Sequence, residues 1–325
     1  MTEYKSRFAA HMNNMVEYRV ALGYSEKTYA PRLARFDRFI VEKHSDEKQL
    51  SKALVMDWIT RRNEEGASTI QNRAAIARLF AEYLTSVGCD AYILPKNFVS
   101  RRKAFIPYIF SDCELTNLFG AVDRLSDTKK DMLRSCTAST MLRLIYTCGL
   151  RPGEGLRLKK ENVNLDTGEI LITEAKLKKD RKVVVSDDML KLLRKYAMQS
   201  GLAGRGGSQY FFVRQDGYTY DTEWLEAIMK SYFRRANANI EEENLPRVRV
   251  YDLRHRFASA VLCKWLDEGK TLYNMLPYLR TYMGHSSLSE TAYYIHILPE
   301  NLLKSKGIEW DKLDAVIPED DIWGE

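Results

Sequence analysis

Apolar side chains recur every three to four positions through most of the first hundred residues, which is the period of an amphipathic helix. The first predicted helix has four apolar side chains on one face: Phe8, Met12, Met15 and Leu22. Gly23 is suited to end this helix, and Ser25 is placed to cap a second one. The second helix repeats the period at Leu33, Phe36, Phe39 and Ile40.

Two further helices are predicted before residue 90. The third is marked by Val55, Trp58 and Ile59. The turn-like segment 64–66 precedes the fourth, in which residues 68–71 (Ser-Thr-Ile-Gln) have the form of a capping box. Its apolar period continues at Ile76, Leu79, Phe80 and Tyr83. The first hundred residues are therefore expected to form a four-helix bundle.

The pattern changes after this bundle. Residues 96–107 have no period, lie between two prolines and contain the basic run Arg101, Arg102 and Lys103, so we interpret them as an interdomain linker. A helix follows, whose apolar residues are Met141, Leu144, Ile145 and Cys148 and which is expected to end at Gly149.

Short apolar runs then alternate with turns, as expected of a small antiparallel sheet. The runs are 163–165, 170–172 and 183–185, with a turn at 166–168 (Asp-Thr-Gly) and a basic hairpin at 176–182. From Asp187 onward the period is again mainly helical. No period of 20 to 50 residues recurs, which excludes repeat architectures. The fold class is thus mainly α with a small antiparallel β-sheet.

Composition excludes several classes of protein. The chain has 325 residues, of which 45% are hydrophobic and 29% charged, so it is neither disordered nor fibrous. No apolar run approaches the roughly 18 to 20 residues that cross a bilayer, and we expect a soluble, intracellular protein. The five cysteines are scattered with no C-x-x-C pair, which excludes a disulfide framework and a zinc site and predicts reduced thiols.

Charge is informative once it is divided along the chain. Residues 1–103 carry 18 basic and 12 acidic side chains, residues 104–308 carry 31 and 25, and residues 309–325 carry 1 and 7. An acidic tail therefore masks two basic bodies joined by a basic linker. This arrangement favours a polyanion such as DNA as partner, although an ordinary basic enzyme remains an alternative.

Four separate segments contain candidate chemistry. In 149–158, Pro152 would start a helix directly after Arg151, and Glu154 three residues on could hold that arginine. In 174–182, a hairpin tip rich in cations includes Lys176, and lysine is the cation that can give up a proton. Alone, each of these is more often a surface ion pair or a solvated turn.

The third segment, 251–259, contains Arg254 and His255 on what is otherwise an ordinary amphipathic helix. The fourth, 283–296, contains His285 next to a glycine and a Tyr-Tyr pair at 293–294. Neither segment is specific by itself.

In this order, however, the four segments resemble the tyrosine recombinase, or phage integrase, family. That family's signature runs Gly-Leu-Arg-x-x-Glu, a hairpin lysine, Leu-Arg-His, and Gly-His-Ser followed by a tyrosine nine residues after that histidine. The matching residues here are Arg151, Glu154, Lys176, Arg254, His285 and Tyr294. The resemblance covers nearly the whole chain. It implies a helical core-binding (SAM-like) domain at 1–98, a linker at 99–107, a mixed α/β catalytic domain at 108–308, and a tail at 309–325.

One position departs from the family pattern. Tyr251 stands where the family commonly has histidine. A phenol of pKa ~10 can donate a hydrogen bond to a phosphate oxygen but accepts a proton poorly at neutral pH. A general-base role at this position is therefore in doubt. His255 is expected to pack or bond within the domain.

The resemblance implies cleavage of DNA by Tyr294, which forms a 3′-phosphotyrosyl bond and frees a 5′-hydroxyl. Arg151 and Arg254 would bind the scissile phosphate, with His285 and Tyr251 donating further hydrogen bonds. Lys176 would protonate the leaving oxygen, and Glu154 would orient Arg151 and the lysine region. Religation would need no cofactor and no metal ion.

The implied partners are double-stranded DNA with inverted-repeat core sites and further copies of this chain, in a tetramer on DNA in the prokaryotic cytoplasm. Ten residues are candidate DNA contacts: Gln71, Asn72, Arg73, Arg78, Arg101, Arg102, Lys103, Lys178, Lys179 and Arg181. The tail would dock on a neighbouring subunit or fold on its own domain. The chain resembles Xer-like or mobile-element members without an arm-binding domain. A topoisomerase-like nicking-closing enzyme and a non-catalytic accessory protein remain alternatives, and neither the target sequence nor the biological outcome can be predicted.

Overall fold

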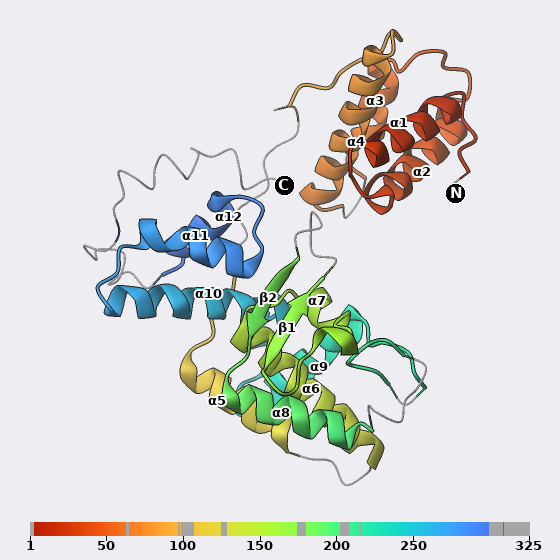
Figure 1. The fold of residues 1–325 in the computed structure, drawn as a ribbon. Helices are drawn as coiled ribbons and strands as arrows, with labels where there is room; N and C mark the ends of the chain where they lie inside the picture. Colours follow the sequence, from red (N-terminus) through yellow and green to blue (C-terminus); the bar gives the residue numbers. More distant parts are fainter. Residues whose placement is uncertain are drawn as a thin grey trace. The chain divides into compact units, whose positions relative to one another are not determined.

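The protein forms two compact units, residues 1–104 and 105–322 (Figure 1). The structure, a computed structural model, describes residues 3–62, 65–96, 98, 107–124, 129–173, 180–201, 208–214, 216–298 and 308, of which 129–132 as backbone only. Among the helices of these residues, none combines the length and apolar content that a bilayer span requires.

The described residues of the first unit form four helices: α1 Ala9–Ala21, α2 Glu26–Lys43, α3 Lys52–Ile59 and α4 Ala67–Ser86. Helices α1, α2 and α3 all pack on α4. Their buried faces meet around Phe36, whose ring lies 4.9 Å from Trp58 and 6.3 Å from Phe80 between ring centroids. These are the apolar positions of the 3.6-residue period, so the expected four-helix bundle is confirmed.

Two details at the helix ends differ from expectation. Leu22 is 55% exposed, because α1 ends at Ala21 and the chain turns at Gly23 with φ +89°. The capping box at 68–71 does not form, because α4 begins earlier, with Gly66 at the N-cap. Ser68 therefore lies inside the first turn. Ser25 does occupy the N-cap of α2, although its side chain makes no capping hydrogen bond.

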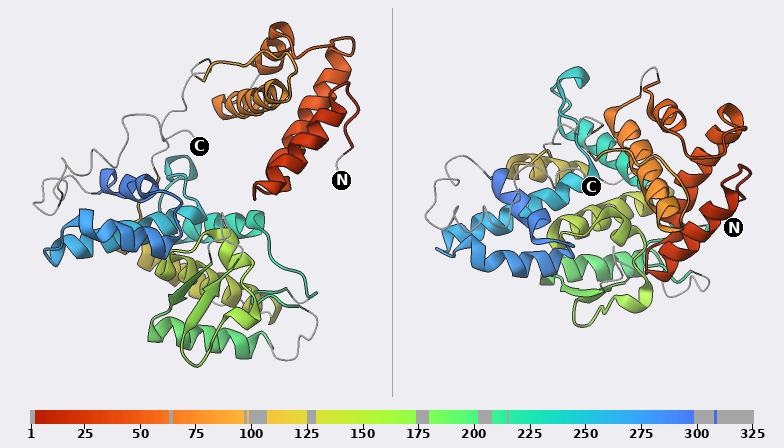
Figure 2. Two further views of the ribbon diagram at one scale, coloured as in Figure 1. Left: turned by 45° about the horizontal axis from the view of Figure 1, so that its top comes forward. Right: turned by 90° about the horizontal axis from the view of Figure 1, so that it is seen from above.

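Where the structure describes it, the second unit is mainly helical with one small sheet. Its elements are α5 Asp112–Asp123, α6 Lys129–Cys148, α7 Pro152–Leu156, η1 Lys160–Asn162, β1 Glu169–Ile172, β2 Arg181–Val184, α8 Asp187–Gln199, α9 Thr222–Ala236, η3 Glu242–Asn244, α10 Val250–Asp267, α11 Leu272–Met283 and α12 Leu288–His296. Helix α6 packs against α5, α8 and α10. In both views of Figure 2, α10, α11 and α12 group together at one end of this unit.

The sheet is smaller than the sequence suggested. Strands β1 and β2 are antiparallel, with Glu169 opposite Val184 and Ile172 opposite Arg181. The predicted run at 163–165 contributes one isolated bridge, from Val163 to Ile170, and forms no strand. The hairpin tip, 174–179, lies outside the described residues. The predicted fold class, mainly α with a small antiparallel sheet, is nevertheless confirmed.

Gly149 ends α6 at a crowded position. Its φ is +59°, and a Cβ built there would clash with the Phe257 ring of α10, lying 2.7 Å from Cε1. Glycine is therefore required both by the left-handed backbone and by the space.

We expect Gly149→Ala to destabilise the second unit by about 2–5 kcal/mol, as a left-handed alanine costs about 1–2 kcal/mol and overpacking about 1–3 kcal/mol more. Gly269 is the matched control, since it follows α10 with φ +71° and has nothing within 4 Å of its Cβ position. Gly269→Ala should cost only the backbone part. Calorimetric unfolding of both variants measures the difference, and equal losses would contradict the steric account.

Candidate active site

The start of α7 fixes the first candidate arginine. Pro152 occupies the first helical position and Arg151 the N-cap. The Glu154 carboxylate accepts a hydrogen bond from the Arg151 backbone N–H (2.9 Å) and another from its Nη1 (2.9 Å). The local arrangement predicted from Arg-Pro-x-Glu is therefore confirmed.

The Arg151 side chain also contacts the fourth segment, residues 283–296. Its Nη2 donates to the carbonyl of Gly284 (2.8 Å), the residue that ends α11 in the left-handed conformation with φ +65°. A glycine suits this position because an L side chain is strained there. The first and fourth segments of the signature thus meet in space.

The second candidate arginine, Arg254, is completely buried. It donates to the carbonyls of Gly149 (2.5 Å) and Met283 (2.7 Å). Gly149 lies two residues before Arg151, and Met283 directly before Gly284. Burial lowers the pKa of Arg254, whereas Tyr251 and Tyr294 act to raise it. Both guanidinium groups are therefore positioned by the same two loops.

His285 is a buried, neutral imidazole. Its Nδ1 lies 2.8 Å from the Thr291 hydroxyl. Burial, with Arg254 and Arg151 next in effect, lowers the pKa of His285 to about 2. Thr291 engages one ring nitrogen, which leaves the other to bind a substrate atom.

Tyr294 lies beside these groups in the same chain. Its ring stacks on that of His285 with centroids 5.9 Å apart, and it is only 2% exposed. Burial raises the pKa of Tyr294, while Arg254 and then Arg151 act to lower it. The phenol is therefore protonated here and needs both a proton acceptor and a charged neighbour to attack.

Tyr251 and His255 lie on α10, on either side of Arg254 in the sequence. Their rings lie 5.0 Å apart, and the His255 ring lies 5.5 Å from that of Tyr294. Burial, followed by Arg249 and Arg254, lowers the pKa of His255 to about 3. Within the described part of the chain its buried Nδ1 has no hydrogen-bond partner. His255 packs within the domain, as the sequence suggested, but against the candidate nucleophile.

The candidate residues of the predicted hairpin have different outcomes. Lys176, Lys178 and Lys179 lie outside the described residues. Arg181 was expected to contact DNA, and this is wrong because its side chain is buried and bonded to Glu154. The alternating pattern of β2, in which Arg181 and Val183 face inward and Lys182 and Val184 outward, could have indicated this.

The sequence model described as "Phage integrase family" matches residues 119–301, which include every catalytic candidate. The chain belongs to the phage integrase family. It is a tyrosine recombinase, an enzyme of site-specific recombination. The nicking-closing and accessory-protein alternatives are not favoured.

Several relatives are similar over most of this recombinase. The relative y4rE of Sinorhizobium fredii is 29% identical over 91% of this chain and 93% of its own. Its name assigns it provisionally to the integrases and recombinases. The tyrosine recombinase XerD of Ralstonia nicotianae is 27% identical over 76% of this chain and 75% of its own. A solved structure of XerH recombinase on a palindromic difH substrate has a TM-score of 0.63 at 18% identity, covering 85% of this chain and 77% of the other.

In the first unit of the recombinase one DNA-contact assignment, that of Arg73, is wrong because the side chain is buried, and the partly exposed Arg78 is bonded within the unit. Arg73 is 7% exposed, and its guanidinium donates to the Trp58 carbonyl (3.1 Å) and pairs with Glu65. Arg78 donates to the carbonyls of Leu94 (2.7 Å) and Pro95 (2.8 Å). Both arginines hold the unit together, and Arg73 in particular is not at the surface. Arg101, Arg102 and Lys103 lie outside the described residues.

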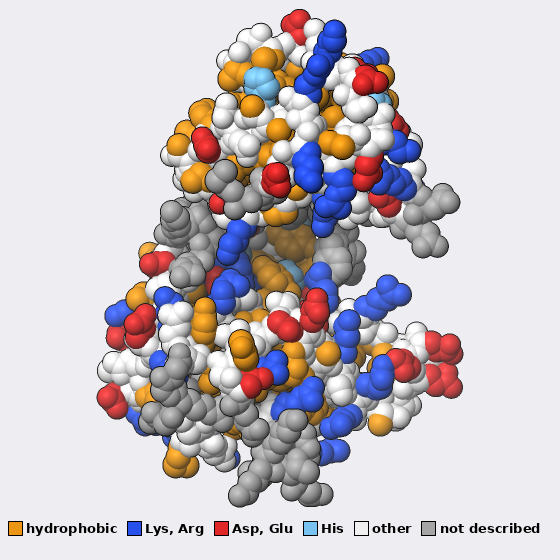
Figure 3. All heavy atoms as spheres, turned by 90° about the vertical axis from the view of Figure 1, so that its right-hand side faces the viewer, with side chains coloured by type: hydrophobic (Ala, Val, Ile, Leu, Met, Phe, Trp, Pro, Cys, Tyr) orange, Lys and Arg blue, Asp and Glu red, His pale blue; other side chains and the backbone are white. Residues whose placement is uncertain are grey.

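Three exposed arginines lie on α2. Arg32, Arg35 and Arg38 recur every three residues and rim a groove of the first unit, together with Arg62 and Asn72. Trp58 and Arg73 form part of its lining. Figure 3 shows Lys and Arg side chains gathered low on the upper body, which is this unit. We call the groove lined by Arg32, Arg35, Arg38, Arg62 and Asn72 the α2 arginine groove. Of the residues predicted at the start of α4, Asn72 lies on this groove.

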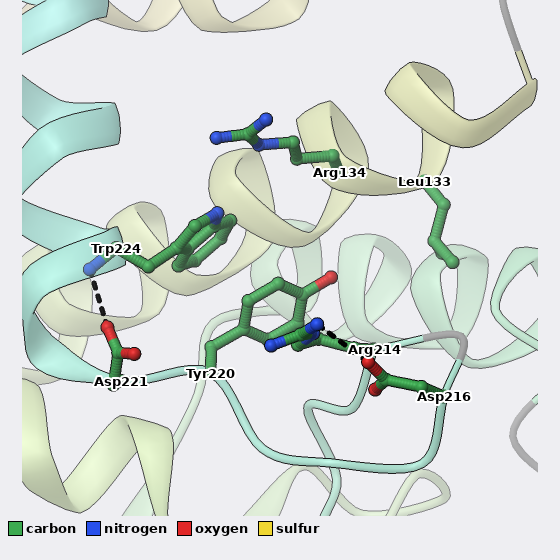
Figure 4. A pocket seen from close by; sticks show the side chains of 7 residues that line it. All are labelled: Leu133, Arg134, Arg214, Asp216, Tyr220, Asp221 and Trp224. Atoms are coloured by element: carbon green, nitrogen blue, oxygen red, sulfur yellow. Dashed lines mark hydrogen bonds and ion pairs between the residues drawn. The ribbon is translucent and has the colours of Figure 1, made fainter.

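Another pocket, between α6 and the segment before α9, is not the active site. Two local interactions engage part of its polar lining, as Figure 4 shows: Arg214 pairs with Asp216 (2.6 Å), and Asp221 accepts from the Trp224 backbone N–H (2.6 Å). The Tyr220 and Trp224 rings pack on each other with centroids 4.0 Å apart. None of the signature residues lines it.

Proposed function

We propose that Tyr294 is the nucleophile and that Arg151, Arg254, His285 and Tyr251 bind the scissile phosphate. The observation that carries this proposal is that both arginines are fixed by the 149–151 and 283–284 segments, with the Tyr294 ring beside His285. The reaction class follows from the family. These residue roles are the proposal.

The chemistry requires positive charge before attack. A phosphodiester repels an anionic nucleophile, and charge builds on its non-bridging oxygens as a fifth bond forms. Two guanidinium groups fixed before substrate arrives stabilise that charge without reorganising, and each such donor is worth about 3–4 kcal/mol of barrier. The Tyr294 oxygen would bond to phosphorus as the bond to the 5′ oxygen breaks, leaving a 3′-phosphotyrosyl link.

Two protons must move in this step. The Tyr294 phenol loses one, and the nearby imidazole of His255 is neutral and therefore able to accept it. Burial is the main cause of the low pKa of His255 and the charges of Arg249 and Arg254 come next, so an incoming phosphate would offset the part that is due to these charges. The leaving 5′ oxygen gains the other proton, which we assign to Lys176.

Covalent trapping on a nicked suicide substrate tests this proposal. Cleavage beside the nick releases a short strand that cannot religate, so the wild-type protein should accumulate a covalent adduct. We expect the adduct to form in EDTA and without ATP, since no step uses a metal ion or nucleotide. A wild-type protein that forms no adduct on a site it binds would overturn the proposal.

We also propose that residues 1–98 act as the core-binding domain and 108–308 as the catalytic domain, joined by the linker at 99–107. The α2 arginine groove would contact the DNA backbone, and Asn72 on its wall would read a base edge. Arg101, Arg102, Lys103, Lys178 and Lys179 would add phosphate contacts.

The groove gives a binding prediction. Arg35→Ala should weaken DNA binding roughly 3- to 10-fold and reduce the slope of log K against log [salt] by about 1, because one phosphate contact is lost. Arg7→Ala is the matched control, since Arg7 is exposed in the same unit but does not line the groove. Filter-binding titrations at several salt concentrations measure both quantities. Equal effects of the two variants would contradict this assignment.

Strand exchange between two duplexes needs four active sites, so we propose a homotetramer on inverted-repeat core sites in the prokaryotic nucleoid. Solved relatives support the DNA partner: XerH is bound to palindromic difH, and the Tn1549 transposon integrase to transposon right-end DNA, with a TM-score of 0.61 at 14% identity over 87% of this chain and 94% of that one. The second relative favours a mobile element. The tail at 309–325, outside the described residues, would dock on a neighbouring subunit or on its own domain.

A further inference from the structure

Arg181 is a buried arginine that none of the assigned roles explains. It is the first residue of β2, and its side chain is 7% exposed, facing the interior between β2, α7 and α11. A buried charge persists only where other groups compensate it. Its contacts therefore indicate what it does.

Three of its nitrogens have fixed partners. Nη1 and Nη2 donate to the two oxygens of Glu154 (3.0 and 2.7 Å), and Nε donates to the carbonyl of Tyr282 (2.8 Å). The paired bonds to one carboxylate are the planar two-point contact that arginine makes and lysine cannot. Arg181 thus joins α7 to the last turn of α11.

Arg151 uses these same two structures. Glu154 also accepts from the Arg151 backbone and from its Nη1, and Gly284, two residues after Tyr282, accepts from its Nη2. The fit is close, because a Cβ on Gly284 would lie 3.0 Å from Nη1 of Arg181. Glu154 and Gly284, which accept from the Arg151 guanidinium, are therefore residues that Arg181 contacts or closely packs against, whereas Tyr251 of α10 interacts with Arg151 alone of the two.

We propose that Arg181 is a positioning residue for the cleavage step. It holds Glu154 and the C-terminus of α11 so that Arg151 presents its guanidinium to the scissile phosphate. It also shares the single carboxylate, so that Glu154 does not neutralise Arg151 alone. This inference rests on the proposed function, because it concerns the site that binds the phosphate.

The test compares Arg181→Gln and Arg181→Lys with Lys182→Gln. Lys182 is the next residue, faces outward and pairs with Glu169 at the surface. Single-turnover cleavage of the nicked substrate, at saturating DNA, should slow about 10²-fold in Arg181→Gln, the scale of an ångström-sized misplacement. Arg181→Lys should be intermediate, because the charge remains but the fork is lost, and Lys182→Gln should cleave at the wild-type rate. DNA affinity should be unchanged in all three.

The pH profile of the cleavage rate provides a further test, because a merely structural role of Arg181 would not shift it. Burial acts to raise the pKa of Glu154, and the bond from Arg181 is the largest cause that lowers it, to about 2. The other charged groups that interact with this carboxylate are Arg151 at the N-cap of α7 and Arg254 of α10. Arg181 itself also interacts with His285 after α11, Tyr282 of α11 and Cys148 of α6. Without Arg181, Glu154 should protonate at a higher pH and release Arg151. The acid limb of the cleavage rate of Arg181→Gln should therefore move to higher pH.

A double mutant tests whether Arg181 acts on cleavage through Arg151. If Arg181 acts through Arg151, then Arg151→Lys with Arg181→Gln should cleave no more slowly than Arg151→Lys alone. Multiplied losses, a wild-type rate for Arg181→Lys, or an acid limb that does not move would each overturn the inference. Should Arg181→Gln fail to fold, Arg181→Lys carries the same measurements. Absence of cleavage by the wild type would instead count against the proposed function.

Discussion

Tyr294→Phe is expected to bind DNA normally and to form no covalent adduct, with cleavage reduced by about 10⁴-fold or more, the scale of removing a nucleophile. The substitution removes one hydroxyl from a side chain that is 2% exposed, and it keeps the ring that packs on His285 and His255. Folding should therefore be retained. The nicked suicide substrate, resolved on a denaturing gel, measures the adduct.

The neighbouring Tyr293 provides the matched control. Its ring lies 6.0 Å from that of Tyr294 between centroids, on the same helix. Tyr293→Phe should cleave at close to the wild-type rate. An adduct that persists in Tyr294→Phe, or that is lost only in Tyr293→Phe, would assign the nucleophile elsewhere.

The largest expected effect on stability comes from Glu154→Gln. This change keeps the size of the side chain but leaves the buried guanidinium of Arg181 and the half-buried one of Arg151 without a counter-charge. Breaking a buried pair in this way costs about 3–5 kcal/mol. In a unit of this size we expect the midpoint of thermal unfolding to fall by about 6–20 °C. Scanning calorimetry measures this shift.

The pH dependence of this effect has a definite sign. The pKa of Glu154 is lowered from 4.5 to about 2, so its ionic contribution is complete above pH 4.5 and is lost as the pH falls toward 2. The stability difference between wild type and Glu154→Gln should shrink across that window. Glu169→Gln, which removes an exposed carboxylate paired with Lys182, should change stability by less than about 1 kcal/mol at any pH. A difference that does not vary with pH would contradict the ionic explanation.

Local chemistry was predictable from the sequence, because neighbouring residues determine it. Pro152 and Glu154 around Arg151 specify a helix start in which the carboxylate returns to the arginine, and the structure has that arrangement. The helical periods of the first hundred residues likewise specified the bundle. The order of the four segments indicated the family, but not how they meet.

The missed features depend on partners far away in the chain. Arg73 and Arg181 each have polar neighbours in the sequence, which do not indicate that they are buried. Arg73 is buried because it bonds to Trp58 and Glu65. Arg181 is buried because it bonds to Glu154 and Tyr282. The acceptors of Arg254 are backbone carbonyls, which no residue type reveals. The α2 arginines had a visible spacing of three, but the amides at the start of α4 were favoured over them.

Gly149 joins two requirements in one residue. Its missing side chain leaves room for Phe257, and its carbonyl accepts a hydrogen bond from Arg254. A library built to retarget this recombinase should leave position 149 fixed, because a variant there would lose fold and chemistry together and selection could not tell which had failed. The exposed arginines of α2 share no such coupling, so substitutions at these proposed phosphate contacts should change DNA affinity at little risk to the scaffold.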